Sequence, residues 1–182
     1  MKVIFLDFDG VLNSRRFMLE CAEGGRSGVT GLDPKAVAHL NRICRQTGAA
    51  IVVSSSWRIG RTLEQLREVL REAGCTAAVE DATPRSYEIA DAKLARAFAE
   101  RGIGLTDEEA GHVLVAAKGR GREIDAWLSK REGKVESFVV LDDDSDVAPH
   151  GDRHVKTTFA DGLMGEHVPL ALEILSRPWG RP

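Results

Sequence analysis

An apolar run at the start of the chain, Val3 to Leu6, leads directly into two aspartates, Asp7 and Asp9, and then into Gly10. Such a run is typical of a strand buried on both faces, because helices cover each side of a central parallel strand. Side chains at positions i and i+2 of an extended segment point the same way, so both carboxylates are expected near the carboxyl end of this strand. Open α/β sheets bind their ligands at that end. The chain is therefore predicted to be an α/β protein with a site at these aspartates.

The two carboxylates would repel each other unless a cation lay between them. Mg²⁺ prefers oxygen ligands, so it would offset the repulsion and leave open positions for a phosphate group. Gly10 would let the chain turn sharply and approach a bound ligand closely. For so short a pattern, the simpler alternative is a strand end that carries two solvated or capping acids.

The length and composition of the chain are those of one ordinary domain. The chain has 182 residues, of which 43% are hydrophobic and 29% charged, so it is long enough to bury a substantial core. We expect a single domain over residues 1–182, with a small cap or insertion within 59–117. No apolar run approaches the roughly 20 residues that span a membrane, so we expect a cytoplasmic protein with no membrane partner. The net charge of −3 gives no general attraction to nucleic acid. The three cysteines have no CxxC spacing, so they suggest neither a disulfide framework nor a zinc site.

A second apolar strand, Ile51 to Val53, runs into a cluster of hydroxyls that includes Ser54 and Ser55, followed by Arg58. A strand, a hydroxyl cluster and then a helix offer hydroxyls and backbone amides to an anion at the edge of a sheet. The alternative is a polar turn whose serines only satisfy the local backbone.

Two more segments carry charged side chains, one before a predicted helix and one at the end of a predicted strand. Lys118 and Arg120 precede a helix whose apolar residues repeat at helical spacing. A buried strand over 137–141 ends in four acids within five residues, Asp142, Asp143, Asp144 and Asp146. Their mutual repulsion implies a cation or a set of capped amides. His150 and His154 form a less favoured candidate pair for a transition metal, because oxygen ligands already explain a metal here.

The remaining segments predict alternating strands and helices. Helices are expected from Asp33-Pro34 to Gly48, after a capping box formed by Thr62 and Gln65, over 87–101 with an end at Gly102, and over 168–175. The segment 13–31 is rich in Gly, Ser and Arg and predicts a loop. Short strands are expected at 75–79 and 154–158, and a turn at 81–85.

The segment Asp7-Phe8-Asp9-Gly10-Val11-Leu12 resembles the first motif of the haloacid dehalogenase (HAD)-type phosphohydrolases. The other motifs of that family resemble later segments in the same order: Ser54 or Ser55, then Lys118 or Arg120, then Asp142 with Asp143 or Asp146. The resemblance covers residues 7–146 and implies a Rossmann-like three-layer α/β/α fold with a mostly parallel sheet and at most a small cap. The same pieces also resemble the subgroup associated with RNA-repair and nucleic-acid end-processing proteins.

The resemblance implies a Mg²⁺-dependent phosphatase. Asp7 would attack phosphorus to give an aspartyl phosphate, and Asp9 would serve as general acid and then general base. The metal would be held by Asp7, the backbone carbonyl of Asp9, Asp142 and Asp143. The phosphoryl group and the rest of the substrate would meet Ser54, Lys118 or Arg120, Gly10, Ser55 and Arg58. Lys118 is the first choice for the cation and Ser54 for the hydroxyl.

Other functions stay open at this point. A nucleotide, a sugar phosphate and a phosphorylated nucleic-acid end are all compatible substrates, and phosphotransfer to another acceptor would use the same groups. A receiver-type signalling module also holds Mg²⁺ and a phosphoaspartate, but it needs no acid two residues after that aspartate. A non-catalytic module that binds phosphate and Mg²⁺ would normally have lost Asp7 or Asp9.

Overall fold

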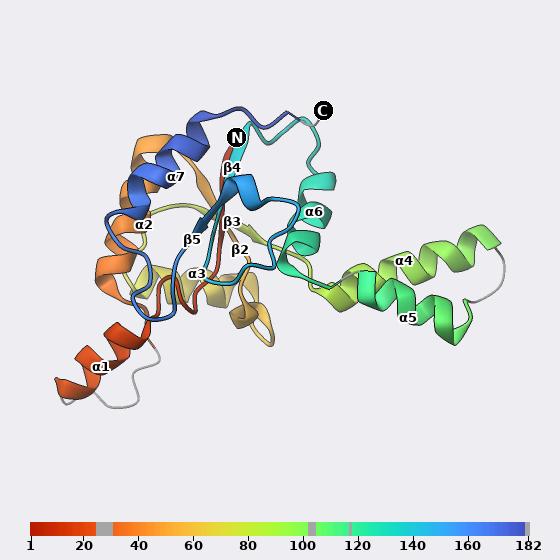
Figure 1. Ribbon diagram of the computed structural model, residues 1–182, viewed down its shortest axis with the longest axis horizontal. Helices are drawn as coiled ribbons and strands as arrows, with labels where there is room; N and C mark the ends of the chain where they lie inside the picture. The colour runs from red at the N-terminus through yellow and green to blue at the C-terminus, as the bar shows by residue number, and fades with distance from the viewer. Residues whose placement is uncertain (25–30, 102–104, 117, 181–182) are drawn as a thin grey trace.

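One parallel sheet forms the centre of the protein (Figure 1). The structure is a computed structural model that describes residues 1–24, 31–101, 105–116 and 118–180. Within these residues the strands follow the order β3-β2-β1-β4-β5 and all pair in parallel. Their bounds are β1 (Lys2–Leu6), β2 (Ala50–Val53), β3 (Val79–Ala82), β4 (Ser137–Asp142) and β5 (His154–Lys156). The predicted α/β fold class is confirmed.

The register of the sheet aligns the ends of its three central strands. Leu6 of β1 pairs with Val53 of β2 and with Leu141 of β4. The residues that follow are Asp7, Ser54 and Asp142, so the polar ends predicted from the sequence lie at one edge. The chain leaves β1 toward β2 on one side and later returns to β4 on the other. This is the switch point at which open α/β sheets form their clefts.

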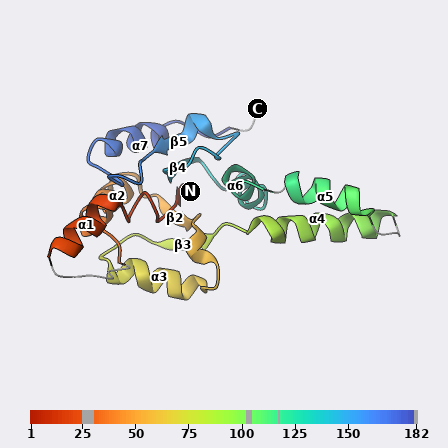
Figure 2. The same cartoon turned by 60° about the horizontal axis from the view of Figure 1, so that its bottom comes forward.

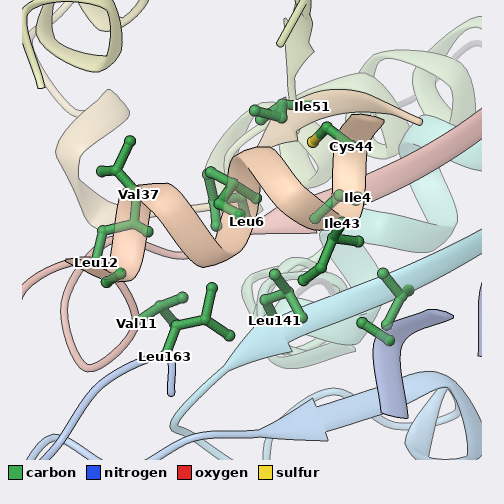
Figure 3. Packing of buried hydrophobic residues seen from close by; sticks show 14 of the residues in the cluster. Ile4, Leu6, Val11, Leu12, Val37, Ile43, Cys44, Ile51, Leu141 and Leu163 are labelled. Carbon is green, nitrogen blue, oxygen red and sulfur yellow. The ribbon is translucent and has the colours of Figure 1, made fainter. Parts of the chain in front are cut away.

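Helices cover both faces of the sheet. Figure 1 shows α2 and α7 on one side and α6 on the other. Alternate residues of β1 serve the two faces: Ile4 and Leu6 pack with α2, α3 and α7, whereas Val3 and Phe5 pack with α6. Figure 3 shows Ile43 of α2 beside Ile4 of β1, within the buried cluster that also includes Leu6. The helices are α1 (Arg15–Glu23), α2 (Pro34–Thr47), α3 (Leu63–Glu72), α4 (Ser86–Arg101), α5 (Asp107–Ala116), α6 (Arg120–Ser129) and α7 (His167–Ser176), with short 3-10 turns η1 (Ser56–Arg58) and η2 (Gly151–Arg153).

The predicted helix caps are present. Asp33 accepts a hydrogen bond from the amide of Lys35 before α2, and Gly48 ends that helix in the left-handed conformation. Thr62 and Gln65 form the reciprocal capping box of α3. The predicted end of α4 at Gly102 lies outside the described residues.

Two local predictions were wrong. Residues 15–23 were expected in a loop but form α1, which Ser14 caps and which buries Phe17 and Cys21. Two buried side chains four residues apart are too short an apolar pattern to stand out in the sequence. The third strand was expected at 75–79 but runs from Val79 to Ala82. Asp81, expected in a turn, lies in this strand because partners from a distant segment hold its carboxylate, namely Trp127 Nε1 at 2.8 Å and Arg131 Nη2 at 2.6 Å.

Helices α4 and α5 pack against each other and extend away from the sheet, as the two views in Figures 1 and 2 show. They lie within 59–117, the segment where a small insertion was expected. Thr106 and Glu109 form reciprocal hydrogen bonds at the start of α5. Among the described residues, no helix has both the length and the apolar character to cross a membrane.

Candidate functional site

Asp7 lies at the centre of a cluster of polar groups at the carboxyl end of the central strands. Its side chain is only 9% exposed. The Phe8 amide donates to Oδ1 at 2.7 Å, and Arg120 Nη2 donates to Oδ2 at 3.1 Å. Burial raises the pKa of Asp7, whereas Arg120 and the hydroxyl of Ser55, which donates to this carboxylate, act in the opposite direction. The donors hold the carboxylate in place beside a fixed positive charge.

Three carboxylates meet at this point. Asp7, Asp142 and Asp143 each offer an oxygen, and these oxygens lie within 4.8 Å of one another. Burial raises the pKa of Asp142 to about 7; Arg120 lowers it, and the neighbouring Asp7 raises it again. Asp142 Oδ2 is buried without a hydrogen-bond partner, although Arg120 Nε lies 3.0 Å away. An orphaned oxygen within a set of oxygen donors suits a hard divalent cation.

Gly10 makes room for one member of this group. Its φ of +71° is a left-handed conformation, and a side-chain carbon at this position would overlap with the carboxylate of Asp143. The hydroxyl of Thr157 donates to the Gly10 carbonyl at 2.6 Å and fixes the turn. The sharp turn predicted at Gly10 is therefore present, and it places Asp143 beside the other two acids.

The cation in the site is Arg120. It is the first residue of α6 and contacts both Asp7 and Asp142, whereas Lys118 is exposed. Asp146 accepts from the amide of Arg120 at 2.9 Å, and its carbonyl accepts from Gly121 at 3.0 Å. Asp146, which the resemblance offered as an alternative to Asp143, thus holds the start of α6. Lys118 was the first choice for this cation and Arg120 the second. Of the two, the structure brings only Arg120 to Asp7 and Asp142.

The two serines after β2 have different partners. Ser54 is buried and lies with its hydroxyl 3.4 Å from that of Thr83, on the strand side. Ser55 is also buried, and its hydroxyl binds Asp7. The sequence ranked Ser54 first, but the structure brings Ser55 to the central carboxylate.

Arg58 forms a buried ion pair with Glu123 of α6 and donates to the carbonyl of Ser55 at 2.5 Å. Burial lowers the pKa of Arg58, and Glu123 opposes this shift. Glu123 also accepts from the amide and the hydroxyl of Ser86, both at 3.0 Å. Arg58, predicted to bind substrate, is thus engaged inside the protein, where it supports the Ser55 segment. Glu123 was missed because its one signal, an acid directly before the buried Ile124, is weak.

The carboxylate of Asp9 has two donors of its own. The indole Nε1 of Trp57 donates to Oδ2 at 2.9 Å, and Asn13 Nδ2 donates to Oδ1 at 3.2 Å. Trp57 belongs to η1, so the segment after β2 reaches across to the segment after β1. The sequence indicated no role for Trp57, because a single tryptophan after a serine run carries no signal for one.

The histidines considered for a transition metal bind different partners. His150 Nε2 lies 3.0 Å from Asp125 Oδ1, whereas His154 Nε2 lies 2.9 Å from the backbone carbonyl of Asp142. Neither histidine belongs to the group of Asp7, Asp142 and Asp143, whose donors are all oxygens.

A cavity of about 230 Å³ opens beside Arg120. It lies between η1, the start of α4 and the start of α6, with Asp146 on its rim. Its lining includes Ser56, Arg58, Ser86, Gly119, Arg120 and Glu123.

One comparison with known proteins gives a match. The model of a family described as "HAD domain in Swiss Army Knife RNA repair proteins" matches residues 3–168, which include every residue of the site described above. No curated protein and no solved structure matches the chain.

Proposed function

The chain belongs to the family of HAD domains in Swiss Army Knife RNA repair proteins, and on this basis we propose that it is a Mg²⁺-dependent phosphatase that acts on a phosphorylated nucleic-acid end. The observation that carries the proposal is the convergence of Asp7, the acids after β4 and Arg120 at one edge of the sheet. Asp9 lies two residues from Asp7, and Trp57 donates to its carboxylate. One carboxylate for attack and another for proton transfer are what an aspartyl-phosphate mechanism requires.

Asp7, Asp142 and Asp143 would hold the metal through their carboxylates, and the backbone carbonyl of Asp9 would add a fourth oxygen. When bound, Mg²⁺ would supply positive charge that offsets these acids and draws charge from the phosphoryl oxygens. The orphaned Asp142 Oδ2 and the closeness of the three carboxylates support this assignment, because a bound cation would give these oxygens a common partner.

Side chains of the protein would carry out the remaining steps of the reaction. An oxygen of Asp7 forms a bond to phosphorus as the bond to the leaving oxygen breaks, and Asp9 protonates that leaving oxygen. Asp9 then takes a proton from water as the water attacks phosphorus, which releases inorganic phosphate and restores Asp7. Arg120 and the hydroxyl of Ser55 lie where they can hold the nucleophile and the non-bridging oxygens.

The α4–α5 pair would be the small cap expected within 59–117. Its first residue, Ser86, is bound to Glu123, which pairs with Arg58 and lies 3.8 Å from Arg120. The base of the pair is thereby fixed to the site, and the cavity lies at this junction. A small cap leaves room for a bulky substrate, which agrees with a nucleic-acid end.

Steady-state hydrolysis tests the function directly. We expect turnover of p-nitrophenyl phosphate that depends on Mg²⁺ and stops with EDTA, and a higher kcat/KM for 3′- or 5′-phosphorylated oligonucleotides than for free nucleotides or sugar phosphates. Preference for a free nucleotide or sugar phosphate would contradict the substrate class alone. Mg²⁺ binding without turnover of any of these esters would instead favour a non-catalytic binding module.

Mg²⁺ is expected to stabilise the native protein and not the Asp142→Asn variant, which lacks one ligand. At a Mg²⁺ concentration about 100 times Kd, linkage gives about 2.7 kcal/mol, or a rise in Tm of about 5–10 °C for a chain of this length. Thermal unfolding with Mg²⁺ or EDTA measures this. Asp144→Asn is the matched control, because Asp144 is an exposed acid two residues away. Equal Mg²⁺ shifts in both variants would exclude Asp142 as a ligand.

A further inference from the structure

We propose that Trp57 is a positioning residue that holds the carboxylate of Asp9 in the orientation needed for proton transfer. The inference rests on the proposed function, and its basis is the 2.9 Å hydrogen bond from Trp57 Nε1 to Asp9 Oδ2. The two residues are 48 positions apart in the chain. Only the parallel pairing of β1 with β2 brings the segments that follow these strands together.

The indole is itself firmly held. Its ring packs edge-to-face on Phe8, with centroids 5.3 Å apart, and the guanidinium of Arg61 lies 5.1 Å from its centroid. Arg61 Nη1 also donates to the Trp57 carbonyl at 3.2 Å, and the Trp57 amide donates to Ser55 Oγ at 3.3 Å. With the ring and the backbone both fixed, the indole N–H has one direction in which to point.

The chemistry of the donor suits this task. An indole N–H donates a hydrogen bond but cannot accept a proton, so it orients Asp9 without competing as a base. It is also uncharged, so it does not draw Asp9 into an ion pair of the kind that Arg120 makes with Asp7. Asn13 holds the other oxygen at 3.2 Å. Together these donors hold both oxygens of the carboxylate that would transfer protons.

Trp57→Phe removes the N–H and keeps an aromatic ring on Phe8. We expect kcat for a 3′-phosphorylated oligonucleotide to fall by about 10-fold or more with little change in KM, because general acid catalysis is needed for an alkoxide leaving group. The fall in the phosphorylation rate with p-nitrophenyl phosphate, measured in a single turnover, should be smaller, because p-nitrophenolate leaves without a proton. Trp179→Phe is the matched control, since that indole packs on Phe138 outside the site.

A double-mutant cycle with Asp9→Asn tests whether Trp57 acts through Asp9. If it does, Trp57→Phe causes no further loss in the Asp9→Asn background. The proposal would be overturned if Trp57→Phe lowered the rate equally for both leaving groups. It would also be overturned if the losses in rate of the two single variants added in the double variant.

A measurement that needs no activity separates this inference from the proposed function. In ¹⁵N-labelled protein, the indole resonance that Trp57→Phe deletes should shift strongly in Asp9→Asn, while those of Trp127 and Trp179 stay in place. An unchanged Trp57 resonance would overturn the inference even in an active enzyme. Absence of all turnover together with the expected shift would instead overturn the phosphatase assignment and leave the Trp57–Asp9 contact established.

Discussion

Asp7→Asn is expected to lower kcat by about 10⁴-fold or more, a loss typical of removing a catalytic nucleophile. The amide has nearly the shape of the carboxylate and its oxygen can still accept from the Phe8 amide, so the fold should survive. What disappears is the charged oxygen that would attack phosphorus. Single-turnover hydrolysis of p-nitrophenyl phosphate at saturating Mg²⁺ gives the rate, and thermal unfolding checks the structure.

Two further variants make this result specific. Asp144→Asn removes a charge from the same acidic segment at an exposed position, so its kcat should stay close to that of the native protein. Asp7→Ala should be as inactive as Asp7→Asn, which excludes a contribution from slow hydrolysis of the new amide. A native-like rate in both Asp7 variants would contradict the aspartyl-phosphate mechanism.

Arg120→Met is expected to reduce both activity and stability. The change keeps an unbranched side chain but removes the charge that faces Asp7, Asp142 and Glu123. We expect kcat to fall by about 10²- to 10³-fold, as for other fixed groups that stabilise transition-state charge. In EDTA the free energy of unfolding should fall by about 3–5 kcal/mol, because the buried acids lose their partner. Urea unfolding with and without Mg²⁺ measures this, and Mg²⁺ should restore part of the loss.

Lys118→Met is the control for Arg120→Met. It removes the same charge at an exposed position two residues earlier, so the free energy of unfolding should change by no more than about 0.5 kcal/mol. Its activity should stay near the native value. If Lys118→Met were inactive and Arg120→Met active, the cation would be the one that the sequence ranked first, and the observed contacts of Arg120 would not be those of the working enzyme.

The sequence alone determined the fold class, and it predicted that the residues of the candidate site would share one end of the sheet. Apolar runs before Asp7, Ser54 and Asp142 predicted buried parallel strands, and side chains that end neighbouring parallel strands must share one edge of a sheet. Helix caps at Asp33 and Thr62 were equally readable, because a cap depends on residues within one turn. Where the signal was weak or came from distant residues, the prediction was wrong. This was so for α1, which was expected as a loop, and for the strand that contains Asp81.

Only the tertiary structure decided which side chains meet in the candidate site. Spacing along the chain could not separate Lys118 from Arg120, because the choice depends on where α6 begins. That start is fixed by Asp146 and by Gly121, which has no side chain to clash with the carbonyl of Ala148. Likewise the contact of Trp57 with Asp9 joins two strand ends. Local pattern determines the element that carries a residue, whereas packing between distant elements determines which atoms meet.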